Sequence, residues 1–251
     1  MSSHNSDRSR RSVAVVVVAA GRGERFAGAA PKALEVIADR SLLAHTLSHV
    51  AQVADIDQIV VAAPATHLPD TDAICAQFPA LLITIVAGGQ ERHDSVAAAL
   101  AVLDPAIDIV IVHDAARAFA PAEVFDRVIA ALVGGHVAVV PGVAVVDTMK
   151  DVDVDGRVRQ TVPRASLRAV QTPQGFSRAE LVNTHTEATA TRDTSDSPVS
   201  PAPTPTDDAG MMEAAGFDVW VVPGHLDAFK ITTPFDRLIA HALVTQREAP
   251  Q

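Results

Sequence analysis

The stretch Val15-Val-Val-Val-Ala-Ala-Gly21-Arg22-Gly23-Glu24-Arg25-Phe26, closed by Pro31-Lys32, says most about the fold of this chain. A β-branched run gives way at once to small residues, two glycines and several cations, which predicts a buried strand that ends in a phosphate-binding loop. Glycines let backbone N–H groups approach an anion, and Arg22, Arg25 and Lys32 would neutralise its charge. The stretch therefore predicts a triphosphate site.

Neither of the two common phosphate-loop patterns matches this stretch. No Gly-Lys-Ser/Thr ends it, and Phe26 stands where the third glycine of a dinucleotide fingerprint would be. An ordinary strand-to-helix turn with solvated arginines is the alternative. The basic residues before the strand, Arg8-Ser-Arg-Arg11, imitate an export signal, but no cleavage-like site follows before Arg22. We expect residues 1–12 to form a polar, mobile tail.

Composition narrows the class of protein. The chain has 251 residues, of which 48% are hydrophobic, enough for one sizeable core. Its net charge of −10 and its lack of tyrosine argue against nucleic-acid binding, which needs a basic face and aromatic platforms. Cys75 is the only cysteine, which favours a reducing cytoplasm. No apolar run is long enough to cross a bilayer, so we expect a soluble, cytoplasmic protein without membrane partners.

Short β-branched runs alternate with Ala/Leu-rich helical stretches, the order that is typical of a doubly wound α/β fold with a mostly parallel sheet. Ser41 is expected to cap one helix, and Pro121 suits the first turn of another. We expect a single domain over residues 13–245. The strands are predicted at residues 13–18, 58–63, 81–86, 109–113, 137–140 and 218–222. Such a sheet binds ligands at the carboxyl ends of its strands.

Two motifs follow predicted strands. Gly88-Gly-Gln-Glu-Arg-His-Asp-Ser95 precedes a helical run, so its glycines suit a tight turn near a base or ribose. Asp94 or Ser95 would cap that helix, and capping explains Ser95 as well as ligand contact does. His113-Asp114-Ala-Ala-Arg117 places an acid and a cation at a strand end, which suits ribose, metal, hydroxyl and phosphate groups; a surface ion pair is the alternative.

Residues 144–168 interrupt the pattern with crowded charges, and Asp155-Gly156 predicts the turn of an exposed hairpin. A lone hairpin is marginally stable, so we expect this arm to pack against a second copy of the chain. Residues 189–205 are rich in Thr, Ser, Pro and Asp, which predicts a flexible loop. Thr206-Asp-Asp then begins a capped helix, and Lys230 is expected at a strand-like end before a helix near Thr233.

In chain order these residues resemble one family, the 2-C-methyl-D-erythritol 4-phosphate cytidylyltransferases of the non-mevalonate isoprenoid pathway. The resemblance runs from Val13 to about Leu243. Two departures are Ala118, where the family commonly has proline, and the length of residues 189–205. The resemblance rests on Ala-Ala-Gly-x-Gly-x-Arg25 with Pro31-Lys32, Gly88-Gly-x-x-Arg-x-Asp-Ser95, His113-Asp-Ala-Ala-Arg117, Asp147-Thr-Met-Lys150, Thr172-Pro-Gln174, Thr206-Asp-Asp and Lys230-Ile-Thr.

The resemblance implies a transferase that moves CMP from CTP to 2-C-methyl-D-erythritol 4-phosphate and releases pyrophosphate. It also implies a Rossmann-like core with a protruding β-arm, a homodimer held through that arm, and Mg²⁺ held mainly by the CTP phosphates, with no protein metal ligand assigned. It assigns Arg25, Lys32 and Lys230 to the triphosphate and its transition state. It assigns the nucleotide to Ala19, Ala20, Gly21, Gly23, Gly88, Ser95 and Asp114, and the sugar phosphate to Asp114, Arg117, Thr172 and Thr206, joined by Thr148 and Arg164 from the partner's arm.

The chemistry suits these residues, because attack on an α-phosphate needs positioning and charge neutralisation more than a protein nucleophile. Two alternatives remain open at this point. One is a nucleotidyltransferase that acts on another polyol or sugar phosphate, which would differ in the arm and near Arg117. The other is a non-catalytic nucleotide-binding protein of the same fold, against which the cations Arg25, Lys32 and Lys230 argue.

Overall fold

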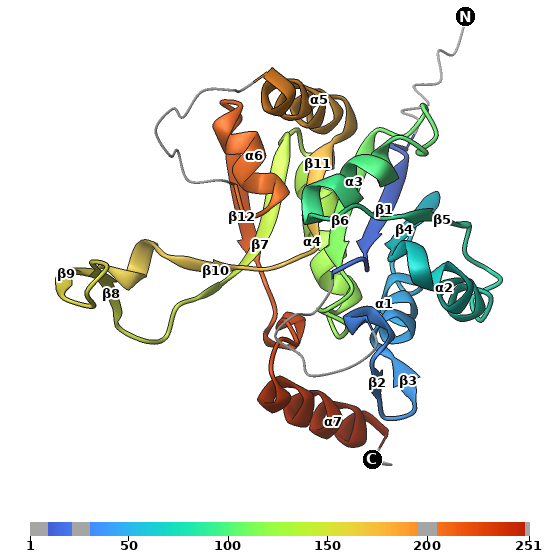
Figure 1. Cartoon of the computed structure of the whole chain (residues 1–251), viewed down its shortest axis with the longest axis horizontal. Coiled ribbons are helices and arrows are strands. Elements are labelled where there is room, and N and C mark those ends of the chain that lie inside the picture. The colour runs from blue at the N-terminus through green and yellow to red at the C-terminus, as the bar shows by residue number, and fades with distance from the viewer. Residues whose placement is uncertain (1–9, 22–30, 195–204, 249–251) are drawn as a thin grey trace, which may run out of the picture.

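The protein is built around one mixed sheet with helices on both faces (Figure 1). The computed structural model describes residues 10–21, 31–194 and 205–248. Within these ranges, eight strands form the sheet, in the order β10-β7-β11-β6-β1-β4-β5, with β12 paired to β7. They are β1 Val13–Val18, β4 Gln58–Ala63, β5 Ile83–Ala87, β6 Ile109–Asp114, β7 Ala138–Ala144, β10 Arg168–Val170, β11 Gln174–Ser177 and β12 Val219–Pro223.

The strand β1 lies at the centre of the sheet, parallel to both neighbours. Val16 is in register with Val60 of β4 and with Val112 of β6. A strand buried on both faces reads as a continuous apolar run, which is why residues 13–18 signal a parallel sheet so clearly. The predicted α/β class with a mostly parallel sheet is confirmed. Antiparallel β11, between β6 and β7, was not predicted.

Successive residues of β1 point to opposite faces, and each face has its own hydrophobic cluster. The helices are α1 Leu42–Val50, α2 Leu68–Cys75, α3 Arg92–Leu100, α4 Ala122–Val133, α5 Arg178–Thr194, α6 Asp208–Ala214 and α7 Pro234–Glu248. Val15 and Val17 pack in the cluster that includes residues of α1 and α4, whereas Ala14 and Val16 pack with residues of α3, α5 and α6. This is the doubly wound arrangement. No helix in the described ranges is both long enough and apolar enough to cross a bilayer.

The starts of two helices test the predicted caps. Ser41 caps α1 as expected, since its side chain accepts a hydrogen bond from the Ala44 N–H at 3.1 Å. The expectation for α3 was wrong, because the helix begins at Arg92 and Glu91 is its N-cap. Asp94 supports this start from inside the first turn, where its Oδ2 accepts from the Glu91 N–H at 3.1 Å. Ser95 is therefore a buried residue of the helix.

A third hydrophobic cluster fastens α7 to the body of the protein. Ala240 and Val244 of α7 pack with Ile231 and with Ala118 and Phe119, which follow β6. Ala118 is 1% exposed, so its small side chain is enclosed in this cluster. The segment that carries Lys230 is thereby held over the carboxyl end of β6.

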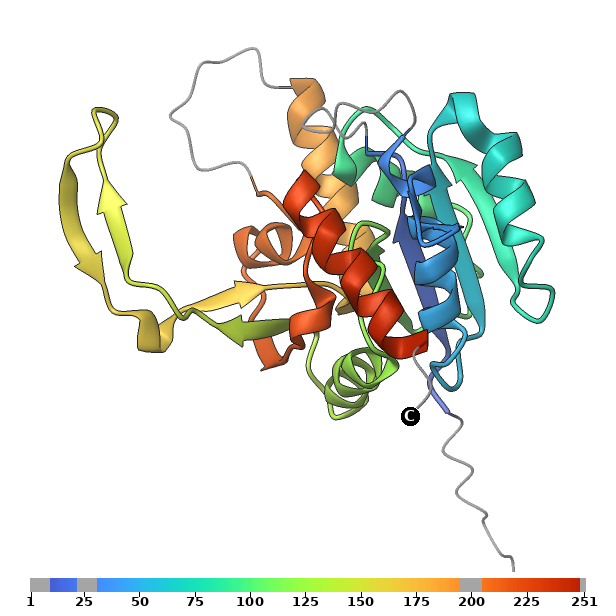
Figure 2. The ribbon, with the colours of Figure 1, turned by 90° about the horizontal axis from the view of Figure 1, so that it is seen from below.

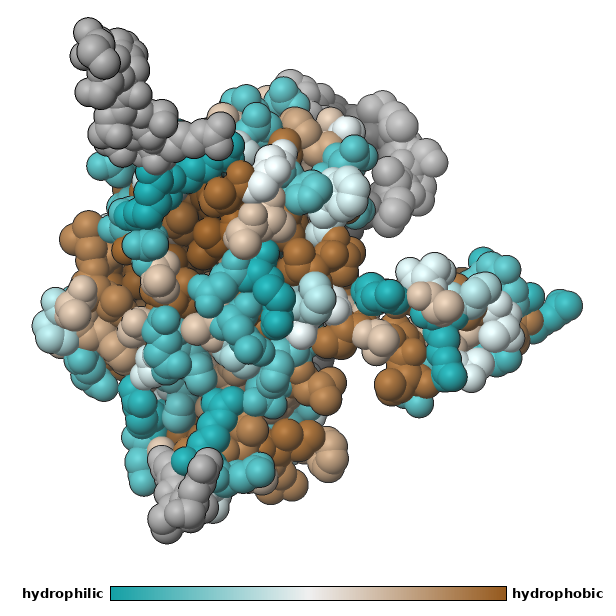
Figure 3. Space-filling model, turned by 180° about the vertical axis from the view of Figure 1, so that it is seen from behind, coloured by the Kyte–Doolittle hydropathy of each residue, from teal (hydrophilic) through white to brown (hydrophobic). Residues whose placement is uncertain are grey.

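The arm extends away from the sheet (Figures 1 and 2). Its hairpin pairs β8 Met149–Val152 with β9 Val158–Val162, and β10 joins its base to β7. Gly156 takes a φ of +85°, as expected for the turn. Figure 3 shows both apolar and hydrophilic residues on the surface of the arm. Val146 and Val154, which lie in the arm, are 80% and 99% exposed.

Several predicted boundaries need correction. The helix α5 continues to Thr194, so the predicted flexible loop 189–205 begins too early; residues 195–204 lie outside the described residues. The hydroxyls of Thr186 and Thr189 donate to carbonyls four residues earlier in the helix, at 2.8 and 2.9 Å, so both have partners within α5. The strands β5 and β7 end later than predicted.

The two ends of the predicted domain also differ from expectation. The predicted tail 1–12 is too long, because Arg10 Nη2 pairs with Asp57 Oδ1 at 2.6 Å and the Ser12 N–H donates to Asp108 Oδ2 at 3.0 Å; residues 1–9 lie outside the described residues. At the other end, α7 runs to Glu248. The expectation that Lys230 ends a strand was wrong, since β12 ends at Pro223 and the 3₁₀ turn Leu226–Ala228 lies between.

Candidate active site

The carboxyl ends of β1 and β5 meet the first turn of α3. A Cβ built on Gly88 would lie 2.4 Å from Ala20 Cβ and 2.8 Å from Ser95 Oγ, so only glycine fits between them without a shift. The Gly88 N–H donates to the Ala63 carbonyl at 2.8 Å, and the Gly89 N–H donates to Ser95 Oγ at 3.2 Å. The predicted nucleotide-binding residues Ala20, Gly88 and Ser95 are therefore in contact.

The phosphate-binding loop is described only at its two ends. Ala19 is anchored, because its N–H donates to the Ala62 carbonyl at 2.8 Å, whereas Gly21 is exposed. The predicted residues Gly23 and Arg25 lie outside the described residues. Lys32 resumes the chain in the 3₁₀ turn Lys32–Leu34.

Lys32 is half-buried and close enough to Lys230 to feel its charge. Burial and the positive charge of Lys230 lower the pKa of Lys32 to about 8, against the opposing effect of Asp114, Asp236 and Glu35. Two cations repel each other, so the fold rather than mutual attraction holds Lys32 close to Lys230. Such a pair provides a concentrated positive charge for a polyanion.

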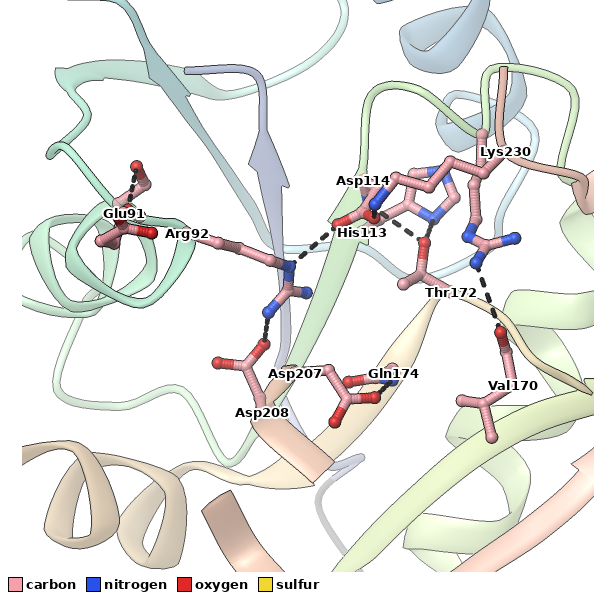
Figure 4. A network of polar contacts seen from close by, with 12 residues as sticks. Glu91, Arg92, His113, Asp114, Val170, Thr172, Gln174, Asp207, Asp208 and Lys230 are labelled. Atoms are coloured by element: carbon pink, nitrogen blue, oxygen red, sulfur yellow. Dashed lines mark hydrogen bonds and ion pairs between the residues drawn. The ribbon is translucent and has the colours of Figure 1, made fainter. Parts of the chain in front are cut away.

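Asp114, the last residue of β6, links two cations from distant parts of the chain (Figure 4). Its Oδ1 accepts from Arg92 Nε at 3.1 Å, and its Oδ2 lies 2.7 Å from Lys230 Nζ. Burial alone would raise the pKa of Asp114, but Arg92 and Lys230 lower it below its usual value. The side chain is 10% exposed, so the alternative of a surface ion pair does not describe it.

Thr172 is held against the end of the same strand. Its Oγ1 accepts from the Asp114 N–H at 3.0 Å and lies 3.0 Å from His113 Nδ1 (Figure 4). Burial lowers the pKa of His113 to about 3, so its ring is neutral at physiological pH. Thr172, a predicted substrate-binding residue, is only 4% exposed and its hydroxyl already has partners. Thr172 therefore fixes the backbone of Asp114.

Arg117 joins the base of the arm to the segment that carries Lys230. Its Nη1 donates to the Ala228 carbonyl at 2.8 Å, and its Nη2 donates to the Val170 carbonyl at 3.3 Å. Its Nε is buried without a hydrogen-bond partner in the described part of the chain. The guanidinium thus bonds to two backbone carbonyls, and the surface ion pair that His113-Asp114-Ala-Ala-Arg117 offers as an alternative does not describe it.

The remaining predicted residues lie farther out. Thr206 is exposed, just before Asp207, the N-cap of α6. Thr148 and Arg164 are both exposed on the arm, where Arg164 Nη1 donates to the Val146 carbonyl. Thr148 comes directly before β8 and Arg164 shortly after β9, so both belong to the arm, which extends away from the sheet that carries Asp114 (Figure 2).

The structure adds site residues that received no role from the sequence. Arg92 lies between Asp114 and Asp208, and Asp208 also contacts His185 Nε2 at 3.0 Å. Gln174 Nε2 donates at 2.7 Å to Oδ2 of Asp207, the residue before Asp208. Arg92 and both aspartates stand inside motifs quoted above, but pairing between residues far apart in the chain leaves no local sequence signal.

The cluster can therefore hold an anionic ligand beside the ends of β1, β5 and β6. In the described residues no group of three or more His, Cys, Asp or Glu side chains could hold a metal ion. Lys32, Lys230 and Arg117 provide positive charge, and Asp114 orients two cations at once. Such a site favours charge stabilisation and positioning over attack by a protein nucleophile.

Comparison with known proteins places this geometry in a family. The family model of 2-C-methyl-D-erythritol 4-phosphate cytidylyltransferase matches residues 13–246. The chain is 46% identical to the cytidylyltransferase of that name from Frankia casuarinae, over 93% of this chain and 82% of that protein. For the one from Saccharopolyspora erythraea, the identity is 42%, over 93% and 99%.

Solved structures agree with the sequence relatives. The crystal structure of 2-C-methyl-D-erythritol 4-phosphate cytidylyltransferase from Thermus thermophilus is 32% identical, with a TM-score of 0.74, and 93% of this chain and 99% of that one are covered. The 4-diphosphocytidyl-2C-methyl-D-erythritol synthase from Anaerococcus prevotii is 28% identical, with a TM-score of 0.79 and coverage of 94% and 99%. The chain belongs to the 2-C-methyl-D-erythritol 4-phosphate cytidylyltransferase family.

Proposed function

We propose that this chain transfers CMP from CTP to 2-C-methyl-D-erythritol 4-phosphate. A phosphate oxygen of the methylerythritol phosphate attacks the α-phosphorus of CTP, the bond from that phosphorus to the bridging oxygen breaks, and pyrophosphate leaves. The products are 4-diphosphocytidyl-2-C-methyl-D-erythritol and pyrophosphate. The observation that carries the proposal is the junction of Asp114, Lys230 and Arg92 at the end of β6, close to Lys32, in a chain of this family.

The roles of the cations follow from where negative charge grows in this reaction. Charge develops on the equatorial oxygens of the α-phosphorus and on the leaving pyrophosphate, so fixed cations lower the barrier. We assign Lys32 and Lys230, with Arg25, to those oxygens. Asp114 prepares Lys230 for this role, because its Oδ2 lies 2.7 Å from the ammonium group and positions that group before CTP binds.

The nucleoside and the sugar phosphate are assigned to neighbouring groups. We assign Gly88, Ala20 and Ser95 to the nucleoside, because they are in close contact where the ends of β1 and β5 meet α3. Ala19, Gly21 and Gly23 complete that assignment. Arg117, Thr172, Thr206 and Asp114 are assigned to the methylerythritol phosphate. Arg117 carries the positive charge that a phosphate group requires, and its Nη1 and Nη2 already donate to the Ala228 and Val170 carbonyls, which fix the guanidinium in place.

We propose Mg²⁺ as the ion that arrives with CTP. Both carboxylate oxygens of Asp114 are engaged by cations, and the described residues contain no cluster that would hold an ion alone. This donor set fits an ion held mainly by phosphate oxygens. When bound, Mg²⁺ would neutralise part of the triphosphate charge, while Lys32 and Lys230 hold the remainder.

We further propose that two copies of the chain share their sites through the arm. Within the described ranges, β8 and β9 pair only with each other, and Val152 and Val158 stay about half exposed, at 48% and 50%. An isolated two-stranded hairpin is marginal in water, and a second copy is the simplest covering. Thr148 and Arg164 would then act in the partner's site.

The proposed activity is tested by pyrophosphate release from CTP in the presence of 2-C-methyl-D-erythritol 4-phosphate. Other polyol phosphates and sugar phosphates serve as competing acceptors, and ATP, GTP and UTP as competing donors. The proposal is supported if pyrophosphate is released rapidly with the pair of CTP and the methylerythritol phosphate and with no other pair of donor and acceptor. Faster release with another acceptor would identify a different nucleotidyltransferase, and CTP binding without release would identify a nucleotide-binding protein.

A further inference from the structure

Asp208 is a completely buried carboxylate, at 0% exposure, in the first turn of α6. Its Oδ1 lies 3.0 Å from Nε2 of His185 on α5, and its Oδ2 contacts Nη1 of Arg92 on α3. Burial alone would raise the pKa of Asp208, but the hydrogen bond with His185 and the charge of Arg92 lower it. The carboxylate is thus ionised and bound on both oxygens.

The far end of the Arg92 guanidinium is bound as well. Its Nε donates to Asp114 Oδ1 at 3.1 Å, so two carboxylates hold one rigid plane at two edges (Figure 4). Arg92 Nη2 is buried with no hydrogen-bond partner in the described residues. A planar group held in this way can transmit a change in the position of Asp208 to Asp114 without bending.

Asp114 in turn contacts Lys230, to which the proposed function assigns a catalytic role. The contacts form a series from His185 to Lys230, in which the charges of Asp208, Arg92, Asp114 and Lys230 alternate in sign. Asp208 contacts Arg92 at Nη1, whereas Asp114 contacts it at Nε, and His185 contacts Asp208. The side chains of His185 and Asp208 are buried, at 6% and 0% exposure, so they have no access to a ligand of their own.

We infer that His185 and Asp208 are positioning residues that act through Arg92 on Asp114. This inference rests on the proposed function, because the site it serves is the same. A buried, half-satisfied charge pair is strongly destabilising, so the series works only when each member keeps its partners. Loss of the His185 contact would let Asp208 and Arg92 shift, and the Asp114 carboxylate would no longer hold Lys230 in one place.

The test is a double-mutant cycle between His185→Leu and Asp114→Asn, read as kcat/KM for CTP in the full-length protein. If His185 acts through Asp114, we expect His185→Leu to lower kcat/KM about tenfold in the natural chain and less than about twofold in the Asp114→Asn background. If the two substitutions act independently, their fold losses in kcat/KM should instead multiply in the double variant. The conservative variant His185→Gln, which retains an N–H donor, is expected to recover most of the loss.

Thr184→Val is the matched control. Thr184 is the neighbour of His185, is buried, and donates to Met212 Sδ at 3.4 Å, so it joins α5 to α6 without touching Arg92. We expect its kcat/KM to stay unchanged. If His185→Leu does not fold, Asp208→Asn enters the cycle instead, because it removes the charge that holds Arg92 but keeps an oxygen acceptor.

The outcomes separate this inference from the proposed function. If the natural protein does not release pyrophosphate, the proposed acceptor is overturned. The same double-mutant cycle, measured by calorimetry of CTP binding, then tests the contacts from His185 to Lys230 without an acceptor. Multiplicative losses in an active protein overturn the inference alone. An unchanged kcat/KM in His185→Leu, or a loss in Thr184→Val as large as that in His185→Leu, does the same.

Discussion

Lys230 Nζ lies 2.7 Å from Asp114 Oδ2, although the 3₁₀ turn Leu226–Ala228 separates Lys230 from the preceding strand of the sheet. The contact is reinforced by the backbone, because the Ile231 N–H donates to the Ala116 carbonyl at 2.8 Å. Arg117 Nη1 adds a bond to the Ala228 carbonyl. The segment before α7 is therefore fixed to the end of β6, which explains how a residue outside the sheet joins its catalytic edge.

The first prediction concerns the charge of Lys32. We expect Lys32→Ala to lower kcat by a factor on the order of 100 or more, because one charge-assisted contact to a developing phosphorane is worth several kcal/mol. Pyrophosphate release measures kcat, and a melting curve shows that the variant folds. A folded variant with near-normal kcat would remove Lys32 from the mechanism.

A second prediction follows from the pKa of about 8 for Lys32. Lys32 loses its charge as the pH rises through that value, so kcat/KM, which reports the free enzyme, should fall above about pH 8. The guanidinium of the Lys32→Arg variant stays charged above pH 8. We therefore expect the fall in kcat/KM of this variant to occur at a higher pH. A decline that occurs at the same pH in both proteins would show that another group is responsible.

The same pKa has a consequence for stability with the opposite sign. Between pH 8 and the usual value near 10.5, the unfolded chain binds more protons at this position than the folded one does. Deprotonation of Lys32 therefore adds to the free energy of unfolding in that range, while it removes activity. A Lys32→Ala variant lacks this contribution. Denaturant titration at pH 8 and pH 10 should therefore show a smaller gain in the free energy of unfolding with pH for this variant than for the natural protein.

For Asp114 the pH dependence lies on the acid side. Its folded pKa is lowered by Arg92 and Lys230, so its stabilising contribution is present above about pH 4 and is lost as the pH falls below that. We expect Asp114→Asn to lower the free energy of unfolding by on the order of 3 kcal/mol at pH 7. This difference between the two proteins should shrink toward pH 2. A difference that stays constant across this range would mean that Asp114 does not titrate as described.

The contact between Gly88 and Ala20 predicts a steric effect. A Cβ at Gly88 would lie 2.4 Å from Ala20 Cβ, so Gly88→Ala should lower the free energy of unfolding by about 1–3 kcal/mol and weaken CTP binding. Gly21→Ala is the control for stability, since a Cβ there meets no atom of the described residues within 4 Å. Equal melting temperatures for both variants would contradict the close contact.

The arm is tested by mixing two inactive variants. If Arg164 serves the partner's site, a dimer of Lys32→Ala with Arg164→Ala has one site with both defects and one with neither. Random assembly of equal amounts makes about half of the dimers mixed, so about a quarter of all sites should recover natural activity. Arg164 would be assigned to its own subunit if mixed dimers form and activity does not rise.

Much of the sheet could be predicted because its signals are local. Residues 13–18 are apolar on both faces, and Asp155-Gly156 turns the arm with a φ of +85° at Gly156. The antiparallel insertion of β11 between β6 and β7 could not be predicted, since the short segment Gln174–Ser177 carries no sign of its partners. Sequence patterns identify where strands lie in the chain better than they identify which strands pair in the sheet.

The site was predictable in part for the same reason. Asp114 and Ser95 follow predicted strands, so the sheet brings them to one edge. The pair of Arg92 and Asp208 joins residues 116 positions apart, and only the folded chain brings these charges together. The extent of α5 was missed because its Thr-rich end resembles a loop in composition, although the helix continues to Thr194.

The central claim is that this site moves CMP from CTP to 2-C-methyl-D-erythritol 4-phosphate. The most direct measurement is pyrophosphate release by the natural protein with both substrates, together with mass spectrometry of the product and with Asp114→Asn as the matched variant. We predict release that depends on both substrates, a product that contains CMP joined to the methylerythritol phosphate, and a large loss in Asp114→Asn. Release without the acceptor, a product formed faster from another polyol phosphate, or full activity in Asp114→Asn would contradict the account.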